Sequence, residues 1–144
     1  MTGGALAAWD PSLKVFLKRS VIISAITVVA VLLVGRIIGV WSDNWYVFYI
    51  GPVLVLIYST LIEDPNRWRL ARRSRWYLQS DAVIHNGPEG EARIPLSDIV
   101  DIRTRFGWSV VLFLKGGMRV SMAYLPDSKN VALQIRAARE RLMP

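Results

Sequence analysis

The sequence predicts an α+β membrane protein, in which an N-terminal two-helix transmembrane hairpin precedes an antiparallel β-barrel or sandwich with a C-terminal amphipathic helix. Three observations support this fold class. Two long apolar runs lie close together in the first half of the chain. After them, apolar residues recur with a period of two, which is typical of half-buried strands. In the last segment they recur at helical spacing instead.

The two apolar runs predict the transmembrane hairpin of residues 21–62. The first run, residues 21–40, is interrupted by a single charged residue, and twenty helical residues at about 1.5 Å each span the roughly 30 Å hydrocarbon core of a bilayer. The second run, residues 45–62, contains no charged residue and is also long enough to cross. Residues 41–44 form a short turn between them. A cleaved signal peptide is the alternative for the first run, but no small-residue cleavage site follows it.

Basic residues flank these runs in a pattern that predicts orientation. Lys14, Lys18 and Arg19 precede the first run, the turn has no Lys or Arg, and five arginines follow the second run within residues 67–75. Lys and Arg accumulate on the cytoplasmic side of membrane proteins. We therefore expect a multi-pass protein with both termini in the cytoplasm, and residues 1–20 form its cytoplasmic N-terminal segment.

Three glycines and one arginine stand out inside the predicted spans. Gly35 and Gly51 lie at similar depth from the turn, where a missing side chain lets two helix backbones approach closely, so they are candidates for packing within the hairpin. Gly35 and Gly39 also match the small-xxx-small pattern of helix dimers, which leaves a homodimer as the alternative. Arg36 is the intramembrane charge and hence a functional candidate. Its position about one turn from the outer interface favours snorkelling toward lipid phosphate.

Residues 63–75 are predicted to form a basic juxtamembrane helix and linker. Asp64 followed by Pro65 is typical of a helix start. The residues expected at the membrane surface, in contact with lipid, are Arg67, Trp68, Arg69, Arg72, Arg73 and Arg75. Each basic residue near an anionic leaflet contributes about 1 kcal/mol. Since two spans already anchor the chain, we expect these arginines to fix topology and orientation, with specific recognition of anionic lipid as the alternative.

Residues 76–144 are predicted to form the cytoplasmic domain. Alternating apolar residues predict six short antiparallel strands, separated by turns at Ser80-Asp81, at residues 86–90 and at Gly116-Gly117. Asp127 or Ser128 then caps a final helix. Its apolar face is expected to cover the sheet and comprises Val131, Ile135, Ala138 and Leu142.

Three segments of this domain carry a resemblance to a known family: WYLQ at 76–79, AVI at 82–84 and RIPLSDI at 93–99. Together with the closing helix, they resemble the bacterial pleckstrin-homology-like (bacterial PH) domain family of membrane proteins, over roughly residues 15–142. The resemblance implies a PH-like barrel in the bacterial inner (cytoplasmic) membrane. It also implies a role such as assembly of membrane complexes. The short Ser80-Asp81 connection departs from the basic loop of phosphoinositide-binding relatives, so their headgroup pocket is not expected.

Little in the sequence predicts catalysis. The chain has no cysteine, and His85, its only histidine, is expected on a strand surface. No glycine-rich phosphate-binding motif occurs, and the basic residues lie beside the apolar runs rather than along a nucleic-acid-binding face. We therefore predict no enzyme activity, cofactor, metal or nucleic-acid partner.

The predicted role is that of an accessory, assembly or scaffolding subunit of a larger membrane protein complex. Its partners would be membrane lipids and another integral membrane protein. An anionic-lipid-binding membrane-surface module is the alternative. A small channel is a more distant one, because the apolar runs offer no polar pore lining.

Overall fold

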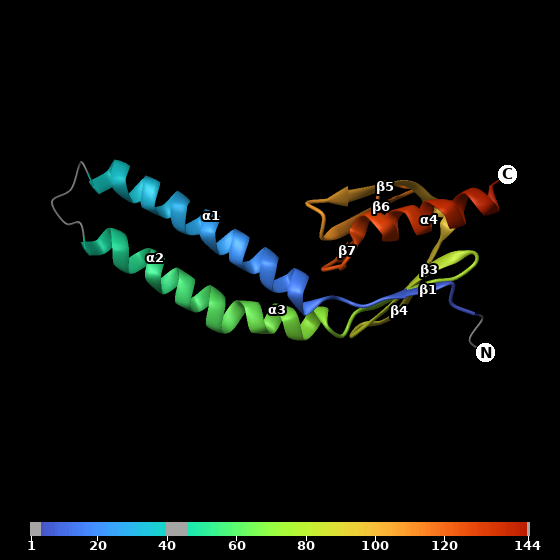
Figure 1. Cartoon of the computed structure of the whole chain (residues 1–144), viewed down its shortest axis with the longest axis horizontal. Coiled ribbons are helices and arrows are strands. Elements are labelled where there is room, and N and C mark those ends of the chain that lie inside the picture. Colours follow the sequence, from blue (N-terminus) through green and yellow to red (C-terminus); the bar gives the residue numbers. More distant parts are fainter. Residues whose placement is uncertain (1–3, 40–45, 144) are drawn as a thin grey trace. The chain divides into compact units, whose positions relative to one another are not determined.

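A computed structural model of the chain describes residues 4–39 and 46–143, and it divides into two compact units (Figure 1). The β unit comprises Met1–Phe16 and Leu70–Pro144, and the helical unit comprises Leu17–Arg69. The predicted turn at residues 41–44 and residue 40 lie outside the described residues. The α+β class of the fold is confirmed.

One described helix is long and apolar enough to cross a membrane. This helix, α1, runs over Leu13–Gly39, and its apolar part covers Leu13–Ile38. Only 6% of its most apolar 18-residue window is buried. The helix begins eight residues before the predicted span because residues 13–20 contain no glycine or proline to interrupt it.

The second apolar run does not form a single long helix. Helix α2, Tyr46–Tyr58, has 13 residues, which is too short to cross a bilayer alone. A π-helical turn, η1, follows at Ser59–Glu63, and α3 continues over Asp64–Ala71. The predicted second span at residues 45–62 is therefore not shown as a transmembrane helix.

The π-turn has an identifiable cause in the sequence. The Asp64 backbone N–H donates to the Ser59 carbonyl, five residues back. The next residue, Pro65, has no N–H with which to continue an α-helical ladder, and its ring would clash with the carbonyl four residues earlier. Asp64 thus lies inside a continuous helical path rather than capping a new helix (Figure 1).

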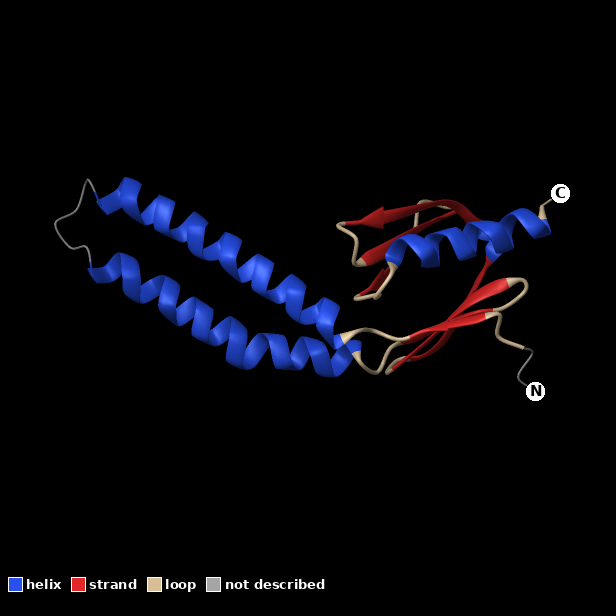
Figure 2. Cartoon of the chain, in the orientation of Figure 1, coloured by secondary structure: helices blue, strands red, loops and turns tan. Residues whose placement is uncertain are grey.

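The β unit contains two antiparallel sheets, drawn as red arrows in Figure 2. The first has the order β1 (Ala7–Trp9), β2 (Arg75–Leu78), β3 (Ala82–Gly87), β4 (Gly90–Pro95). The second has the order β5 (Ile99–Arg105), β6 (Ser109–Leu114), β7 (Arg119–Ala123). A 3-10 turn, η2 (Leu96–Asp98), connects them without pairing β4 to β5. In the described ranges no barrel closes, so of the two predicted arrangements only the two-sheet one is formed.

Strand β1 precedes the helical unit in sequence and pairs with β2, which follows it. Ala7 lies opposite Leu78, and Trp9 lies opposite Trp76. The Leu6 backbone N–H also donates to the Leu78 carbonyl at 2.7 Å. The sequence analysis expected no strand here. Residues 10–74 are therefore inserted between two neighbouring strands of one sheet.

The core of the β unit lies between the inner faces of the sheets and the last helix, α4 (Ser128–Leu142). The predicted N-cap is confirmed, since the Asp127 carboxylate accepts a hydrogen bond from the Asn130 N–H at 3.1 Å. The core residues come from all three elements, and the most enclosed are Val83, Leu96, Ile99, Ile102, Val110, Leu112, Met122, Leu125 and Ile135. The apolar face of α4 ends before Leu142, which is 45% exposed.

We predict that Trp9→Ala destabilises the β unit. Trp9 is partly buried against the core beside Ala7, and truncation should remove about 2 kcal/mol from the free energy of unfolding, roughly half the cost for a fully buried tryptophan. Urea titration of the full chain in detergent, followed by hydrogen exchange of β2 and β3 peptides, measures this change. Leu6→Ala is the control, because Leu6 is 59% exposed and its loss should cost under about 0.5 kcal/mol. Equal effects of the two variants would contradict the prediction.

Candidate functional site

A cleft of about 650 Å³ opens on the inner face of the first sheet. Trp76, His85 and Ala92 lie opposite one another across β2, β3 and β4, so their side chains share one face. Two residues along each strand, Leu78 and Val83 belong to the same face and to the core. The cleft therefore continues the core face beyond the hydrophobic core.

Aromatic rings form part of the cleft wall. Trp76 is 4% exposed, and its ring centroid lies 4.2 Å from that of the half-buried His85, with 31° between the planes. Gly87 allows this placement, because a Cβ there would lie 2.7 Å from His85 Cε1. The sequence analysis expected His85 on a strand surface. It lies on β3, as expected, but its ring packs against a buried tryptophan.

Two acidic residues also lie along the cleft, Glu89 in the β3–β4 turn and Glu91 on β4, where Glu91 pairs with Asn86 on the sheet face opposite Ala92. Glu89 and Glu91 are exposed, and in the described part of the chain neither makes an ion pair. Ser121 and Ala123 of β7 line the cleft as well. Among the described lining residues none is Lys or Arg, although the whole chain carries a net charge of +7. Exposed Arg72 and Arg73 nevertheless lie between the lining residues Ala71 and Ser74, so the surroundings of the cleft carry both signs of charge.

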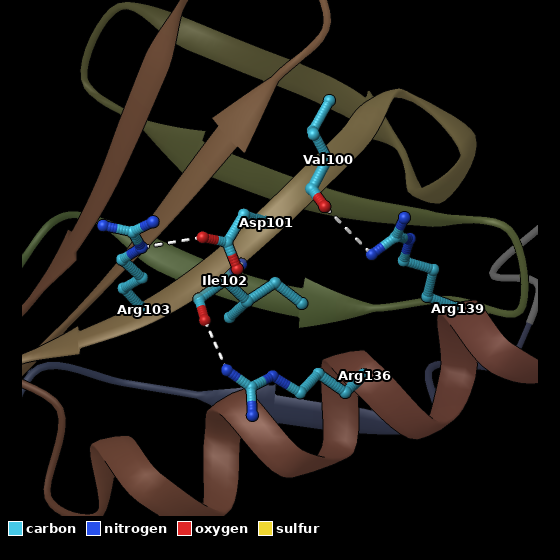
Figure 3. Close-up of polar contacts among 6 residues, drawn as sticks. All are labelled: Val100, Asp101, Ile102, Arg103, Arg136 and Arg139. Carbon is cyan, nitrogen blue, oxygen red and sulfur yellow. Dashed lines mark hydrogen bonds and ion pairs between the residues drawn. The ribbon is translucent and has the colours of Figure 1, made fainter.

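A second polar cluster lies where α4 crosses strand β5 (Figure 3). Arg136 Nη2 donates to the Ile102 carbonyl at 2.6 Å, and Arg139 Nη1 donates to the Val100 carbonyl at 3.1 Å. Strand β5 is an edge of its sheet, and its pairing with β6 shifts at a bulge between Ile99 and Asp101. The two guanidinium groups therefore satisfy edge carbonyls that β6 does not reach.

Asp101 lies beside this cluster in a cationic environment. Its carboxylate accepts from Arg103 Nε at 2.7 Å and from the Ile102 backbone N–H at 2.8 Å. The hydrogen bond from Arg103 and then that from Ile102 lower the pKa of Asp101 below its ordinary value of 3.8. Asp101 is therefore ionised at neutral pH, and its role here is to hold Arg103 in place.

The predicted membrane-surface residues are divided between the helical unit and the β unit. In the helical unit, Arg67 pairs with Glu63 of the preceding turn, Trp68 is half-buried and Arg69 is exposed. In the β unit, Arg72 and Arg73 follow α3 and are exposed. Arg75 begins β2, where its Nε lies 3.5 Å from an Asp10 carboxylate oxygen. Their proposed contact with lipid stays a prediction.

The predicted helix-packing and charged residues lie near the far ends of α1 and α2. Gly35, Arg36 and Gly39 belong to the last turns of α1, and Arg36 is exposed. Gly51 lies in α2, where no atom comes within 4 Å of a Cβ built on it. The seam and the dimer at these glycines, and the role of Arg36, stay predictions.

The sequence analysis missed one polar link inside the helical unit. The Ser20 hydroxyl of α1 donates to the Asp64 carboxylate at the start of α3. The link joins residues 44 positions apart in the sequence, so no local pattern indicates it. It joins α1 to the second helical stretch near the ends that connect to the β unit.

No protein-family model matches this sequence, and no curated protein matches it either. Among the described residues there is also no group of three or more His, Cys, Asp or Glu side chains that could hold a metal ion. The function of this chain is therefore inferred from its own geometry.

We predict that Arg136→Met loosens the β5 edge. Methionine keeps most of the apolar stem but removes the donor to the Ile102 carbonyl, which should cost about 1 kcal/mol. Hydrogen exchange of β5 peptides in the full chain should become roughly fivefold faster. The matched control is Arg141→Met on the same helix, because Arg141 is exposed and makes no described hydrogen bond. Unchanged β5 exchange in Arg136→Met would show that the guanidinium does not protect this edge.

Proposed function

We propose that this chain is a non-enzymatic accessory, assembly or scaffolding subunit of a membrane protein complex, anchored in the bacterial inner membrane by its helical unit. One observation carries the proposal: α1 is a 27-residue apolar helix that the rest of the chain leaves almost entirely uncovered. Exposed residues along it include Ile26, Leu33 and Ile37. Such a surface is stable in lipid or against other membrane helices, and not in water.

Two other roles for α1 fit this geometry less well. A core helix of a soluble protein would be buried, whereas only 6% of the most apolar window of this helix is buried. A cleaved signal peptide would take β1 away with it, because β1 precedes the helix. That cleavage would strip Ala7 and Trp9 from the sheet and the core. A membrane anchor that is not cleaved leaves β1 in place and the β unit complete.

The position of β1 also favours two crossings of the membrane. Residues 10–74 begin and end beside paired strands of one sheet, so a chain that crosses along α1 has to cross back. The 13 residues of α2 and the five of η1 form one helical path, and residues 46–62 carry no charge. That path is roughly as long as the hydrocarbon core is thick. The basic residues on both flanks favour the cytoplasmic side for the β unit.

Several features favour docking of a partner over chemistry. The helical unit presents apolar side chains on which other membrane helices can pack, and the β unit contains an open cleft and free sheet edges. The two antiparallel sheets with α4 also suit the PH-like domain that the sequence resembles, an architecture that serves many binding roles.

Anionic-lipid recognition is the second candidate function. Arg69, Arg72 and Arg73 are exposed and, in the described ranges, make no ion pair. Free guanidinium groups near a membrane surface attract anionic headgroups at about 1 kcal/mol each. This role is compatible with scaffolding, but it needs no protein partner.

Isolation of the full chain from native membranes in mild detergent tests the proposed role. We predict that the chain elutes as a stoichiometric complex with another integral membrane protein, because the chain alone leaves apolar helix surface exposed on which such a partner can pack. A chain that elutes alone from every mild detergent would contradict this.

The same preparation separates the lipid alternative. An Arg72→Gln, Arg73→Gln variant should keep its protein partner, and Lys129→Gln serves as the control for loss of charge elsewhere. A different outcome would favour lipid binding. If the arginine variant loses bound phosphatidylglycerol or cardiolipin, and neither variant carries a protein partner, then the chain is a lipid-binding module and not a scaffold.

A further inference from the structure

The turn between β5 and β6 holds an exposed phenylalanine in a backbone conformation that this residue type rarely adopts. Phe106 has a φ of 52°, and the next residue, Gly107, has a φ of 76°. The Arg105 carbonyl closes the turn by accepting from the Trp108 N–H at 3.3 Å and from the Ser109 hydroxyl at 3.2 Å. Tight hairpin turns with two positive φ angles favour asparagine, aspartate or glycine at the first of them. The fold of this turn therefore gives no reason for a phenylalanine at position 106.

Aromatic and basic side chains gather at this turn. Phe106 is 69% exposed, and its ring centroid lies 5.5 Å from that of the half-buried Trp108. The Arg105 Cζ atom lies 5.3 Å from the centroid of the Phe106 ring. Arg103, two residues earlier on β5, is exposed on the same face of the sheet. We call Arg105, Phe106 and Trp108 the hairpin tip.

Backbone hydrogen bonds join the hairpin tip to the segment that contacts the beginning of α1. The Leu125 N–H donates to the Trp108 carbonyl at 3.1 Å, and the Ser12 N–H donates to the Tyr124 carbonyl at 2.8 Å. The ring of Phe16, in the first turn of α1, packs edge-on against the Tyr124 ring with 5.1 Å between centroids. All of these residues belong to the β unit. The tip therefore lies at the end of the β unit from which α1 leaves.

This end of the β unit is close to the predicted membrane span. The apolar run of residues 21–40 begins five residues after Phe16, which corresponds to about 7.5 Å along a helix. The other turn of the second sheet, between β6 and β7, lies at the opposite end, because the six residues of β6 separate the two turns. Of the two hairpin turns in this sheet, the β5–β6 turn is thus the one beside the start of the proposed anchor.

From these observations we infer that the hairpin tip binds the membrane by inserting into the interfacial layer of the bilayer that α1 crosses. The Phe106 ring enters the boundary between headgroups and acyl chains, where aromatic side chains are favoured. Arg105 binds lipid phosphate beside it. The inference rests on the proposed membrane anchor, and it adds a second contact that fixes how the β unit is oriented on the membrane.

The shape and charge of the tip favour lipid over a protein surface. A projecting turn with one exposed ring buries little area against a protein, whereas lipid surrounds a ring that enters the interface. In the described ranges Arg105 makes no ion pair, and the Asp127 carboxylate near the tip is engaged in capping α4. Glu89 lines the same cleft as Tyr124 and weakens attraction to anionic lipid. We therefore assign the larger contribution to Phe106 and the smaller one to Arg105.

Quenching by brominated lipid in the cysteine-free full chain tests this inference. Phe106→Cys carries a bimane label, whose aromatic ring takes the place of the phenylalanine. The chain is placed in nanodiscs of three parts phosphatidylcholine to one part phosphatidylglycerol, with and without brominated acyl chains. We expect brominated lipid to reduce the fluorescence at residue 106 at least twofold. Met118→Cys is the matched control, because Met118 is 66% exposed in the β6–β7 turn at the opposite end of the sheet. No quenching at residue 106, or equal quenching at both positions, would overturn the inference.

A second set of variants separates insertion of the ring from its structural role. The reporter is a bimane label on Thr104→Cys, an exposed position next to the tip. Phe106→Asn suits the positive φ and should keep the turn folded, but it should lower quenching of the reporter at least twofold. Met118→Asn is its control and should leave quenching unchanged. Unchanged quenching in Phe106→Asn would overturn the inference, and hydrogen exchange of β6 peptides shows whether each variant is folded.

Charge variants test the contribution of Arg105. Arg105→Gln should reduce quenching of the same reporter by a smaller factor than Phe106→Asn, and only when phosphatidylglycerol is present. Arg119→Gln is the matched control, since Arg119 is an exposed arginine at the start of β7, at the far end of the same sheet. Equal losses in the two arginine variants would overturn the role of Arg105.

A label on Ile26→Cys in α1 keeps this test separate from the test of the proposed function. Quenching at residue 26 without quenching at residue 106 overturns the inference while the membrane anchor and the scaffold role stand. Absence of quenching at both positions overturns the anchor and this inference with it. Quenching at residue 106 in a chain that elutes alone from native membranes supports the inference although the scaffold role fails. A label at residue 106 that only a protein partner shields would assign the tip to protein contact and overturn the inference.

Discussion

The pairing of β1 with β2 is the constraint on which the rest of this structure depends. It joins Ala7 and Trp9, which precede the helical unit, to Leu78 and Trp76, which follow it. The helical unit is consequently an insertion between two paired strands of one sheet rather than an N-terminal extension of the β unit. The three-residue strand β1 is too short to be stable alone, and it is held by the core against which Ala7 and Trp9 pack. Folding of the β unit therefore fixes both ends of the proposed membrane hairpin.

The two edges of the second sheet show how the same physical problem is solved in two ways. Two edge carbonyls of β5, those of Val100 and Ile102, receive hydrogen bonds from α4, so α4 covers this part of the edge. Strand β7 has no paired strand on its outer side in the described ranges, and just beyond its end the Tyr124 carbonyl accepts a hydrogen bond from the Ser12 N–H at 2.8 Å.

Local patterns in the sequence predicted much of this fold, and non-local contacts account for what was missed. Apolar length identified α1, alternation identified the strands of residues 75–123, and residue chemistry identified the Asp127 cap. Strand β1 could not be found this way, because three residues show no clear period and their partner lies beyond the whole helical unit. The helical path of the second run changes from α to π geometry at Ser59–Glu63, and the cause, Pro65, is visible in the sequence but was interpreted as a helix start. The cleft depends on which strands lie at the edges of their sheets, and the alternation of apolar and polar residues does not specify the order of strands in a sheet.

The most direct test of the central claim is the sidedness of single cysteines in the cysteine-free chain. Ala8→Cys before the helical unit, Ser42→Cys in the predicted turn and Ser97→Cys after β4 would be labelled in cells and in inverted vesicles with a membrane-impermeant maleimide. If residues 10–74 cross twice and return to one sheet, Ala8→Cys and Ser97→Cys react from the same, cytoplasmic side and Ser42→Cys reacts from the opposite side. Labelling of Ala8→Cys and Ser97→Cys from opposite sides, or of all three from one side, would contradict the account.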